Sequence, residues 1–245
     1  MNITISRTPE ESGREAAVRI ALELHKAIER QGFARLALST GASQFDTLKA
    51  LVKEPVDWSK VTMFHLDEYV GLPESHIASF RKYLKERFVS QVPLREAVFV
   101  NGEGDVQANI KELTRRITEM PIDVGVIGIG ENGHVAFNDP PADFRTKESY
   151  VIVNLDDRCK QQQVGEGWFR TVSDVPGQAI SMTVSQIMSC RVIVTSCPYA
   201  VKADAIRKTL ETKVTNMVPA TIMKTHPAWY LFIDDASAKE AFPIT

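Results

Sequence analysis

The sequence is poor in the features that mark secreted, membrane-bound and zinc-binding proteins. It has 245 residues but only three cysteines, and no two of them are spaced as a CxxC pair. An odd number of isolated cysteines (Cys159, Cys190 and Cys197) is typical of free thiols in a reducing compartment. No stretch approaches the roughly 18 apolar residues of a membrane span, and residues 1–11 lack the apolar core of a signal peptide. We therefore expect a soluble cytoplasmic protein with no membrane partner.

Net charge and metal-ligand spacing are also lacking. The 29 basic and 31 acidic residues leave a formal net charge of −2, which argues against a nucleic-acid partner. The histidines His65, His76 and His226 have no HxH or HxxxH spacing relative to His134, so the sequence predicts no metal site. The apolar content of 44% supports a packed core rather than a disordered chain.

Apolar runs of strand length alternate with helical segments along the chain. Strands are predicted at 33–38, 61–66, 96–100, 124–129, 150–154, 191–196 and 229–233. Helices are predicted at 12–31, 45–52, 79–90, 106–120 and 199–210, with a helical end to 179–188 and one turn at 219–224; Gly32 is a stop signal for the first helix. This alternation predicts parallel strands joined by crossover helices. Without a repeat or linker, residues 1–245 are expected to form a single three-layer α/β/α domain with a mostly parallel, modified Rossmann-like sheet.

Several polar or glycine-rich turns follow the predicted strands. They are 39–43, 67–69, 128–134 and the loop after Ser196. Ligands of open parallel sheets bind beyond the carboxyl ends of the strands, so these turns are expected to line one cleft.

The turn at 39–43 precedes a predicted helix and consists of Ser39, Thr40, Gly41, Ala42 and Ser43. Free N–H groups and a partial positive charge at a helix start suit a phosphate. The simpler interpretation is an ordinary turn in which Ser43 caps the helix. Lys202, early in another helix, has the same two interpretations: a point charge for an anion in the cleft, or a surface lysine.

Two acids and a histidine are candidates for proton transfer. Asp67 and Glu68 are adjacent at a strand end, and because neighbours in a strand point to opposite faces, at most one of them faces the cleft. A carboxylate there is either a base with a raised pKa or a loop acid that caps the next element. His134 follows three glycines in six positions, and Asp139 lies close enough along the chain to orient its imidazole; a structural histidine is the alternative.

The segment 156–169 is polar and rich in glutamine, with Gly165 and Gly167 near its end. It is either a mobile flap that closes over a ligand or an exposed helix with a buried aromatic end at 168–169. Periodicity does not separate these interpretations.

Two long stretches carry a resemblance to a known family. The runs LDEYVGL (66–72) and GIGENGHVAFNDP (128–140) resemble the glucosamine-6-phosphate deaminases, also called isomerases, and the likeness extends over residues 36–227. The related 6-phosphogluconolactonases share the fold and a Gly-His turn. The Ala-Phe-Asn-acid-Pro continuation and the DEYVGL run are typical of the deaminase branch.

The resemblance implies a chemistry and a substrate. His134 would move a proton between the ring oxygen and O1 of glucosamine 6-phosphate, and Asp67 would carry the C2 proton to C1. The imine then hydrolyses to fructose 6-phosphate and ammonia without a cofactor. The phosphate would bind at 39–43 and Lys202. The same likeness places Asn132 and Asp139 among the catalytic residues, and Glu68 and Gly130 among the substrate-binding ones. A homo-oligomer is left open, and no allosteric site is predicted.

The chain departs from the family pattern at three places. Asn132 stands where members often have Asp, although Asn also occurs. Asp139 replaces the usual Glu and is one methylene shorter, which would lengthen its contact with His134 unless the backbone compensates. In the flap, Gln162 or Gln163 stands near the place of an arginine that contacts the phosphate, and Arg158 or Lys160 are the candidate substitutes.

Two other functions fit the same resemblance. One is a sugar-phosphate lactone hydrolase of the lactonase type. The other is a non-catalytic sugar-phosphate sensor, since effector domains of some transcription regulators resemble this fold. The sequence has no basic recognition helix ahead of the domain, and the presence of both Asp67 and His134 favours catalysis.

Overall fold

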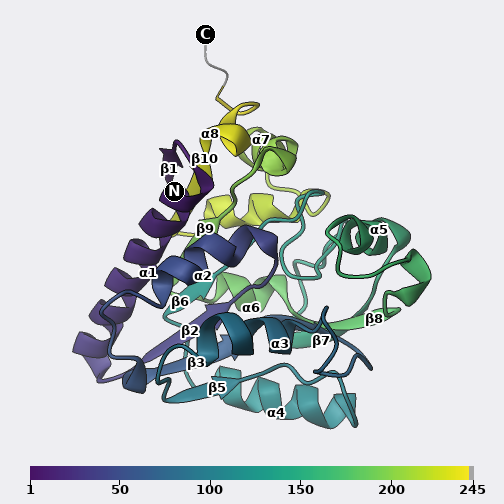
Figure 1. Cartoon of the computed structure of the whole chain (residues 1–245), viewed down its shortest axis with the longest axis horizontal. Coiled ribbons are helices and arrows are strands. Elements are labelled where there is room, and N and C mark those ends of the chain that lie inside the picture. Colours follow the sequence, from purple (N-terminus) through teal and green to yellow (C-terminus); the bar gives the residue numbers. More distant parts are fainter. Residues whose placement is uncertain (243–245) are drawn as a thin grey trace.

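A seven-stranded sheet forms the middle layer of the molecule, and helices cover both of its faces (Figure 1). The computed structural model describes residues 1–242, with the exception of the side chain of Arg158. The strand order is β1-β10-β9-β6-β2-β3-β5, and the neighbours pair in parallel. The bounds are β1 (Asn2–Ser6), β2 (Ala34–Leu38), β3 (Val61–His65), β5 (Glu96–Val98), β6 (Val124–Val126), β9 (Val192–Ser196) and β10 (Trp229–Asp234). The predicted three-layer architecture with a mostly parallel sheet is confirmed.

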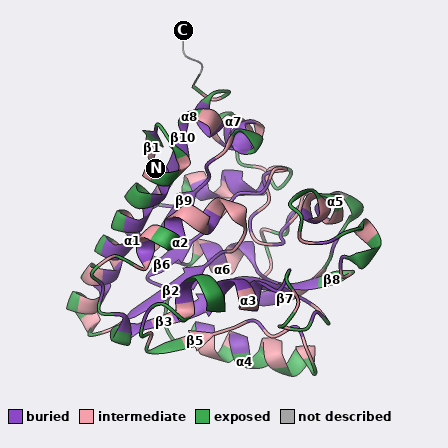
Figure 2. Ribbon diagram, in the orientation of Figure 1, coloured by how far each residue is buried: buried purple, intermediate pink, exposed green. Residues whose placement is uncertain are grey.

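The alternation of side chains along the strands divides the core into two layers. Leu36 and Leu38 pack in one cluster with α1 (Pro9–Gln31), α2 (Phe45–Leu51) and α3 (Phe80–Leu84). Ala37 points the other way, into a cluster with α4 (Val106–Thr118), α6 (Val184–Met188) and α7 (Ala203–Glu211). The inner strands β2, β3, β6, β9 and β10 are largely buried on both faces (Figure 2), as parallel strands covered by helices require.

The remaining elements are short. They are the π-helical turn η3 (Lys85–Val89), the 3-10 turns η1 (Ala42–Gln44), η2 (Trp58–Lys60), η4 (Val172–Asp174), η5 (Ala200–Lys202) and η6 (Pro219–Thr225), and the helix α8 (Asp235–Ala238). The strand β1 and the helix α8 escaped the sequence analysis. None of the helices among residues 1–242 combines the length and the apolar character needed to cross a bilayer.

The ends of α1 follow directly from local sequence. Thr8 accepts a hydrogen bond from the backbone N–H of Glu11, and Pro9 occupies the first turn, where its missing N–H costs nothing. Gly32 ends the helix at φ 83°, a left-handed conformation that suits glycine. The predicted stop at Gly32 is confirmed, whereas the helix begins three residues earlier than the predicted start.

A second, antiparallel sheet departs from the prediction. It joins β4 (Asp67–Tyr69), β8 (Gln178–Met182) and β7 (Tyr150–Asn154) in the order β4-β8-β7. The expectation that 150–154 is a parallel strand of the main sheet is therefore wrong. The chain leaves β3 at Leu66, whose carbonyl accepts a hydrogen bond of 2.8 Å from the Met182 N–H. The alternation of strands and helices carries no information about which sheet a strand enters.

The strand order reverses at the middle of the main sheet. From β2 the chain proceeds to β3 and β5 on one side, while β6, on the other side of β2, continues to β9 and β10. The loops after β2 and β6 therefore diverge, and such a switch point leaves a crevice at the carboxyl ends of the strands.

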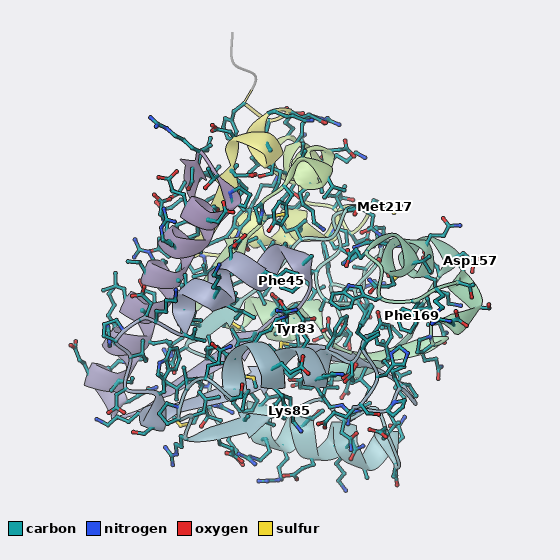
Figure 3. All side chains as sticks on the ribbon, viewed as in Figure 1. Phe45, Tyr83, Lys85, Asp157, Phe169 and Met217 are labelled. Carbon is teal, nitrogen blue, oxygen red and sulfur yellow. The ribbon has the colours of Figure 1, made fainter. Side chains whose placement is uncertain are left out.

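The predicted flap is a helix that lies outside both layers. The helix α5 (Asp157–Gly165) begins at the cap residue Asp156, and it stands apart from the main sheet in Figure 1. Cys159 and Phe169 are buried, and they form a third cluster with Tyr69. Figure 3 shows Asp157 and Phe169 at the two ends of this flap segment. One face of α5 is thus packed against the second sheet.

Candidate active site

A pocket opens where the loops after β2, β6 and β9 meet β4 and α5. Its lining includes most of the residues predicted from the sequence. The lining residues are Ser39, Thr40, Gly41, Ala42, Ser43, Asp67, Phe80, Gly128, Ile129, Gly130, Glu131, His134, Ala136, Phe137, Gln162, Gln163, Glu166, Tyr199, Val201 and Lys202. The pocket therefore lies at the switch point of the sheet, where such folds bind ligands.

The conformation of the loop 39–43 is fixed by contacts with neighbouring residues. Gly41 has φ 100°, a conformation that side chains rarely adopt, and its carbonyl accepts a hydrogen bond of 2.9 Å from the Tyr83 hydroxyl. The ring of Tyr83 in turn stacks on Phe45 at the start of α2, with 5.6 Å between ring centroids (Figure 3). Gln44 precedes α2 without a side-chain cap, so the interpretation of Ser43 as a helix cap is wrong.

Buried polar groups without partners surround this loop. The Ser39 Oγ is buried and has no hydrogen-bond partner within residues 1–242. Such groups are costly unless a ligand or water pairs with them. The loop is thus built to receive a hydrogen-bonding group.

Lys202 lies across the pocket from this loop and is only 7% exposed. No acid in the described part of the chain pairs with it. Tyr199, three residues before, has φ 81°, which is strained for a tyrosine. Two acids hold that residue: its N–H donates to Asp234 at 3.0 Å, and its hydroxyl donates to Asp46 at 2.9 Å. The surface-lysine interpretation of Lys202 is wrong, because its side chain is buried in the pocket wall. The strained backbone of Tyr199 lies at the start of the turn that places it there.

His134 is fixed by two partners on one ring nitrogen. Its Nδ1 lies 2.6 Å from Asn132 Oδ1 and 3.1 Å from Asp139 Oδ1. The amide of Asn132 also donates to Asp139 at 2.9 Å. Because both partners at Nδ1 are acceptors, Nδ1 carries the hydrogen and Nε2 is left for the pocket. The shorter Asp139 therefore still reaches the imidazole, and the backbone has compensated for the missing methylene.

The turn before His134 makes this placement feasible. The imidazole of His134 lies directly on the Cα of Gly130, so closely that a side-chain carbon there would overlap the ring. Gly130 also donates its N–H to the His134 carbonyl at 2.9 Å, and Gly133 closes the turn with φ 84°. Gly130 is needed because only a bare backbone leaves room for the ring.

Asp139 remains ionised behind the imidazole. Burial alone would raise the pKa of its carboxyl, but hydrogen bonds from His134, Asn132 and the Cys159 thiol outweigh burial and lower the pKa below the usual value of 3.8. Neither Asn132 nor Asp139 lines the pocket, and both contact a residue that does, His134.

Asp67 has the opposite surroundings. It is 7% exposed, and its Oδ1 has no hydrogen-bond partner within the described residues. Burial, together with the charge of Glu68, raises the pKa of the Asp67 carboxyl to about 8. A buried, unpaired carboxyl of this kind in a pocket is a candidate general base.

Glu68 faces away from the pocket, which corrects its assignment as a substrate-binding residue. Its carboxylate accepts hydrogen bonds from the Ser79 hydroxyl at 2.8 Å and from the Arg81 backbone N–H at 2.9 Å. The Arg81 guanidinium adds a contact of 3.2 Å, and both side chains are buried. Glu68 therefore anchors the start of α3, and of the two adjacent acids only Asp67 faces the pocket.

The flap contributes neutral and acidic side chains to the pocket. Gln162, Gln163 and Glu166 line it, whereas Lys160 does not. The side chain of Arg158 lies outside the described residues, so its suggested role stays a prediction. Among the candidates for the place of the family's flap arginine whose side chains the structure describes, only the two glutamines reach the pocket.

These features define a class of protein. It is an open α/β protein with a buried carboxyl and a hydrogen-bonded imidazole at the carboxyl edge of its sheet, beside a loop and a lysine suited to an anion. The family model described as glucosamine-6-phosphate isomerases/6-phosphogluconolactonase matches residues 7–231. The chain belongs to this family, which confirms the resemblance of residues 66–72 and 128–140.

Individual relatives cover almost the whole chain. The sequence is 35% identical over 234 residues to the glucosamine-6-phosphate deaminase of Staphylococcus epidermidis (strain ATCC 12228 / FDA PCI 1200), covering 92% of this chain and 95% of that protein. A solved monomeric glucosamine-6-phosphate deaminase is 26% identical, with a TM-score of 0.88 over 98% of this chain and 100% of its own. A 6-phosphogluconolactonase from Shewanella baltica OS155 shares the fold, with 20% identity and a TM-score of 0.78 over 96% of this chain and 97% of that chain.

Some pocket residues escaped the sequence analysis. Phe80, Phe137, Glu166 and Tyr199 line the pocket but were not singled out for function. Phe137 lies inside the 128–140 run, which could have drawn attention to it. Glu166 lies in the segment 156–169 and Tyr199 in the loop after Ser196, so their segments were singled out although the residues were not. Phe80 carries no local signal, because a tertiary contact alone brings it to the pocket.

The contact between Gly130 and His134 predicts the effect of a single methyl group. In Gly130→Ala the added carbon overlaps the imidazole, so the ring must leave its place and its bond to Asp139 must lengthen. We expect the imidazole signals of His134 in a side-chain 1H–15N spectrum to shift clearly from those of the parent protein. Gly177→Ala, where a side-chain carbon meets nothing within 4 Å, is the matched control. Unchanged His134 signals in Gly130→Ala would contradict the packing described.

The surroundings of Asp67 predict how stability changes with pH. Since the unfolded carboxyl loses its proton near 3.8 and the folded one only near 8, the folded state holds an extra proton between these values, and its stability falls as pH rises. Asp67→Asn removes this loss. Its gain in unfolding free energy over the parent should grow with pH across that window, by at most about 1.4 kcal/mol per pH unit. Urea unfolding at several pH values measures it.

An exposed acid supplies the control for that measurement. The pKa of Asp57 is lowered by hydrogen bonds from Ser59 and Lys60, so Asp57→Asn should bring no gain that grows with pH. A pH-independent difference between Asp67→Asn and the parent would show that the Asp67 carboxyl is not buried as described.

Proposed function

We propose that the protein is a glucosamine-6-phosphate deaminase, which converts glucosamine 6-phosphate and water into fructose 6-phosphate and ammonia. The observation that carries the proposal is the meeting of Asp67 and His134 in one pocket that also holds the loop 39–43 and Lys202. Relatives that carry this name and are about one-third identical over nearly the whole chain support it. The reaction combines an aldose–ketose isomerisation with loss of the amine.

Anchoring of the phosphate is the first requirement. We assign it to the backbone and hydroxyl groups of 39–43 and to the ammonium group of Lys202. Lys202 supplies a positive charge in a buried wall, where Coulomb attraction is stronger than in water. Fixing the phosphate positions the far end of the sugar, so that C1 and C2 meet the proton-transfer groups.

Ring opening is assigned to His134. The Nε2 that faces the pocket would take the proton from the O1 hydroxyl and return it to the ring oxygen as the ring bond breaks. Asp139 stabilises the imidazolium formed in between, because its carboxylate lies 3.1 Å from Nδ1. Asn132 holds both side chains in place, because it contacts the His134 ring and donates to Asp139.

Transfer of hydrogen from C2 to C1 is assigned to Asp67. The aldehyde at C1 makes the C2 proton acidic, and a carboxylate with a raised pKa is a stronger base than an ordinary aspartate. Proton delivery to C1 converts the intermediate enol-amine into an imine at C2, and water replaces the nitrogen to release ammonia. These steps are acid–base chemistry that the described residues can perform without a cofactor.

We also propose a cytoplasmic location for the protein. The three cysteines are free and buried, which suits a compartment that keeps thiols reduced. The substrate, a phosphorylated amino sugar, is an intracellular kind of metabolite.

Ammonia release tests the proposed activity. We expect the purified protein to release ammonia from glucosamine 6-phosphate and to leave 6-phosphogluconolactone at its spontaneous rate of hydrolysis, both followed by coupled assays. Lactone hydrolysis without ammonia release would replace the proposal with the lactonase activity. Binding of sugar phosphates with neither reaction would favour a sensor.

Asp67→Asn distinguishes turnover by this protein from turnover by a contaminating enzyme in that assay. Removal of the general base should lower kcat by about 100-fold or more, while binding of fructose 6-phosphate persists. Undiminished turnover in this variant would remove Asp67 from proton transfer.

Lys202→Ala tests the phosphate site. Because Lys202 would contact the phosphate equally in the ground and transition states, its loss should raise KM on the order of tenfold with little change in kcat. Lys208→Ala, a change of an exposed lysine paired with Asp204 on α7, is the matched control. An unchanged KM in Lys202→Ala would place the phosphate elsewhere.

A further inference from the structure

A hydrogen bond joins the flap to the strand that carries Asp67. The hydroxyl of Tyr69 donates to Gln163 Oε1 at 2.7 Å, although the two residues are 94 positions apart in the chain. Tyr69 is completely buried and Gln163 is 6% exposed. Tyr69 and Asp67 lie two residues apart on β4, so their side chains leave the same face of that strand.

The ring of Tyr69 is held on several sides. The rings of Phe80, Phe137 and Phe169 pack against it, with centroid distances of 5.1, 5.3 and 5.5 Å. The flap side is fixed as well, because the Trp168 N–H donates to the Gln163 carbonyl at 3.1 Å. The position of the Tyr69 hydroxyl is therefore set by packing, and its hydrogen bond holds the Oε1 of the Gln163 carboxamide.

This hydrogen bond leaves the carboxamide NH2 of Gln163 available to a ligand. Once Oε1 accepts from Tyr69, the remaining polar group of the side chain is Nε2, a donor of two hydrogens. No described residue accepts a hydrogen bond from it, and Gln163 lines the same pocket as Asp67 and His134. An oriented and unused donor in a pocket wall is arranged for a ligand oxygen.

The pocket wall has few positively charged side chains that could bind a ligand oxygen, so a neutral hydrogen-bond donor matters there. Among the described residues that line the pocket, Lys202 is the one lysine or arginine, and Glu131 and Glu166 are acids. Gln162 differs from Gln163 in that its amide already donates one hydrogen bond to Glu166, at 2.8 Å. Gln163 thus adds donors on the flap side without adding charge.

We propose that Gln163 binds the substrate by donating a hydrogen bond from its carboxamide to an oxygen of the bound sugar phosphate, and that Tyr69 is the positioning residue that orients it. The proposal deepens the proposed function and rests on it only in that the pocket holds a sugar phosphate. In this proposal the flap contacts the substrate through Gln163, and Tyr69 on β4 fixes the position of that contact.

Equilibrium binding of fructose 6-phosphate, titrated calorimetrically without ammonium, tests the proposal. Gln163→Glu keeps an acceptor for Tyr69 but replaces the donor by a negative charge, so Kd should rise about tenfold or more. Gln161→Glu makes the same change on the exposed side of α5 and should leave Kd within about twofold. Equal affinity of Gln163→Glu and the parent, or failure of the parent to bind, would overturn the proposal.

A double-mutant cycle tests the role of Tyr69. Tyr69→Phe keeps the ring packing and should raise Kd about threefold to tenfold, because the carboxamide loses its orientation. In a Gln163→Leu background the same change should have almost no effect, since Tyr69 acts through Gln163. Equal effects in the two backgrounds would mean a merely structural role and would refute the positioning.

Two further probes identify the oxygen and keep this inference separate from the proposed function. If Gln163→Glu also weakens binding of inorganic phosphate, the donor meets the phosphate; if it weakens only fructose 6-phosphate, the donor meets a sugar hydroxyl. Either result supports the proposal. A parent protein that binds fructose 6-phosphate in a manner dependent on Gln163, yet releases no ammonia, would reject the deaminase activity alone.

Discussion

Two adjacent acids on β4 have opposite surroundings, and the pocket depends on that difference. Glu68 receives hydrogen bonds from Ser79 and Arg81, so its charge is satisfied within the protein. Asp67 receives none at Oδ1 and lies in the pocket wall. An unpaired buried carboxyl is unfavourable for folding, and the anchoring of its neighbour keeps the strand, and thus Asp67, in place. The protein tolerates a local cost at the point where reactivity requires it.

The imidazole side of the pocket is organised by backbone geometry instead. The switch point between β2 and β6 brings the turn 128–134 beside the loop 39–43, and Gly130 provides the bare surface on which the ring of His134 lies. The side chains of Asn132 and Asp139 then need only fix one ring nitrogen. The carboxyl and the imidazole thus come from different sheets, and the packing between the layers sets their separation.

Much of this arrangement is readable from local sequence. The parallel sheet follows from the alternation of apolar runs and helices, and the pocket loops follow from turns placed after strands. The antiparallel sheet was missed because Leu66 passes from one sheet to the other through a long-range bond to Met182. The strained backbone of Tyr199 has no sequence signature, since nothing in the local sequence predicts a positive φ at a tyrosine. The contact between Tyr69 and Gln163 joins distant segments, which periodicity cannot relate.

In the proposed mechanism the two aspartates have different parts in proton transfer, and their pKa values are shifted in opposite directions. The pKa of Asp139 is lowered by its hydrogen bonds, so its carboxylate is available to stabilise an imidazolium that forms on His134 during ring opening. Asp67 has a pKa raised to about 8, so its carboxylate is a stronger base towards the C2 hydrogen than an ordinary aspartate. The separation of these values by burial and hydrogen bonding assigns each carboxyl its role.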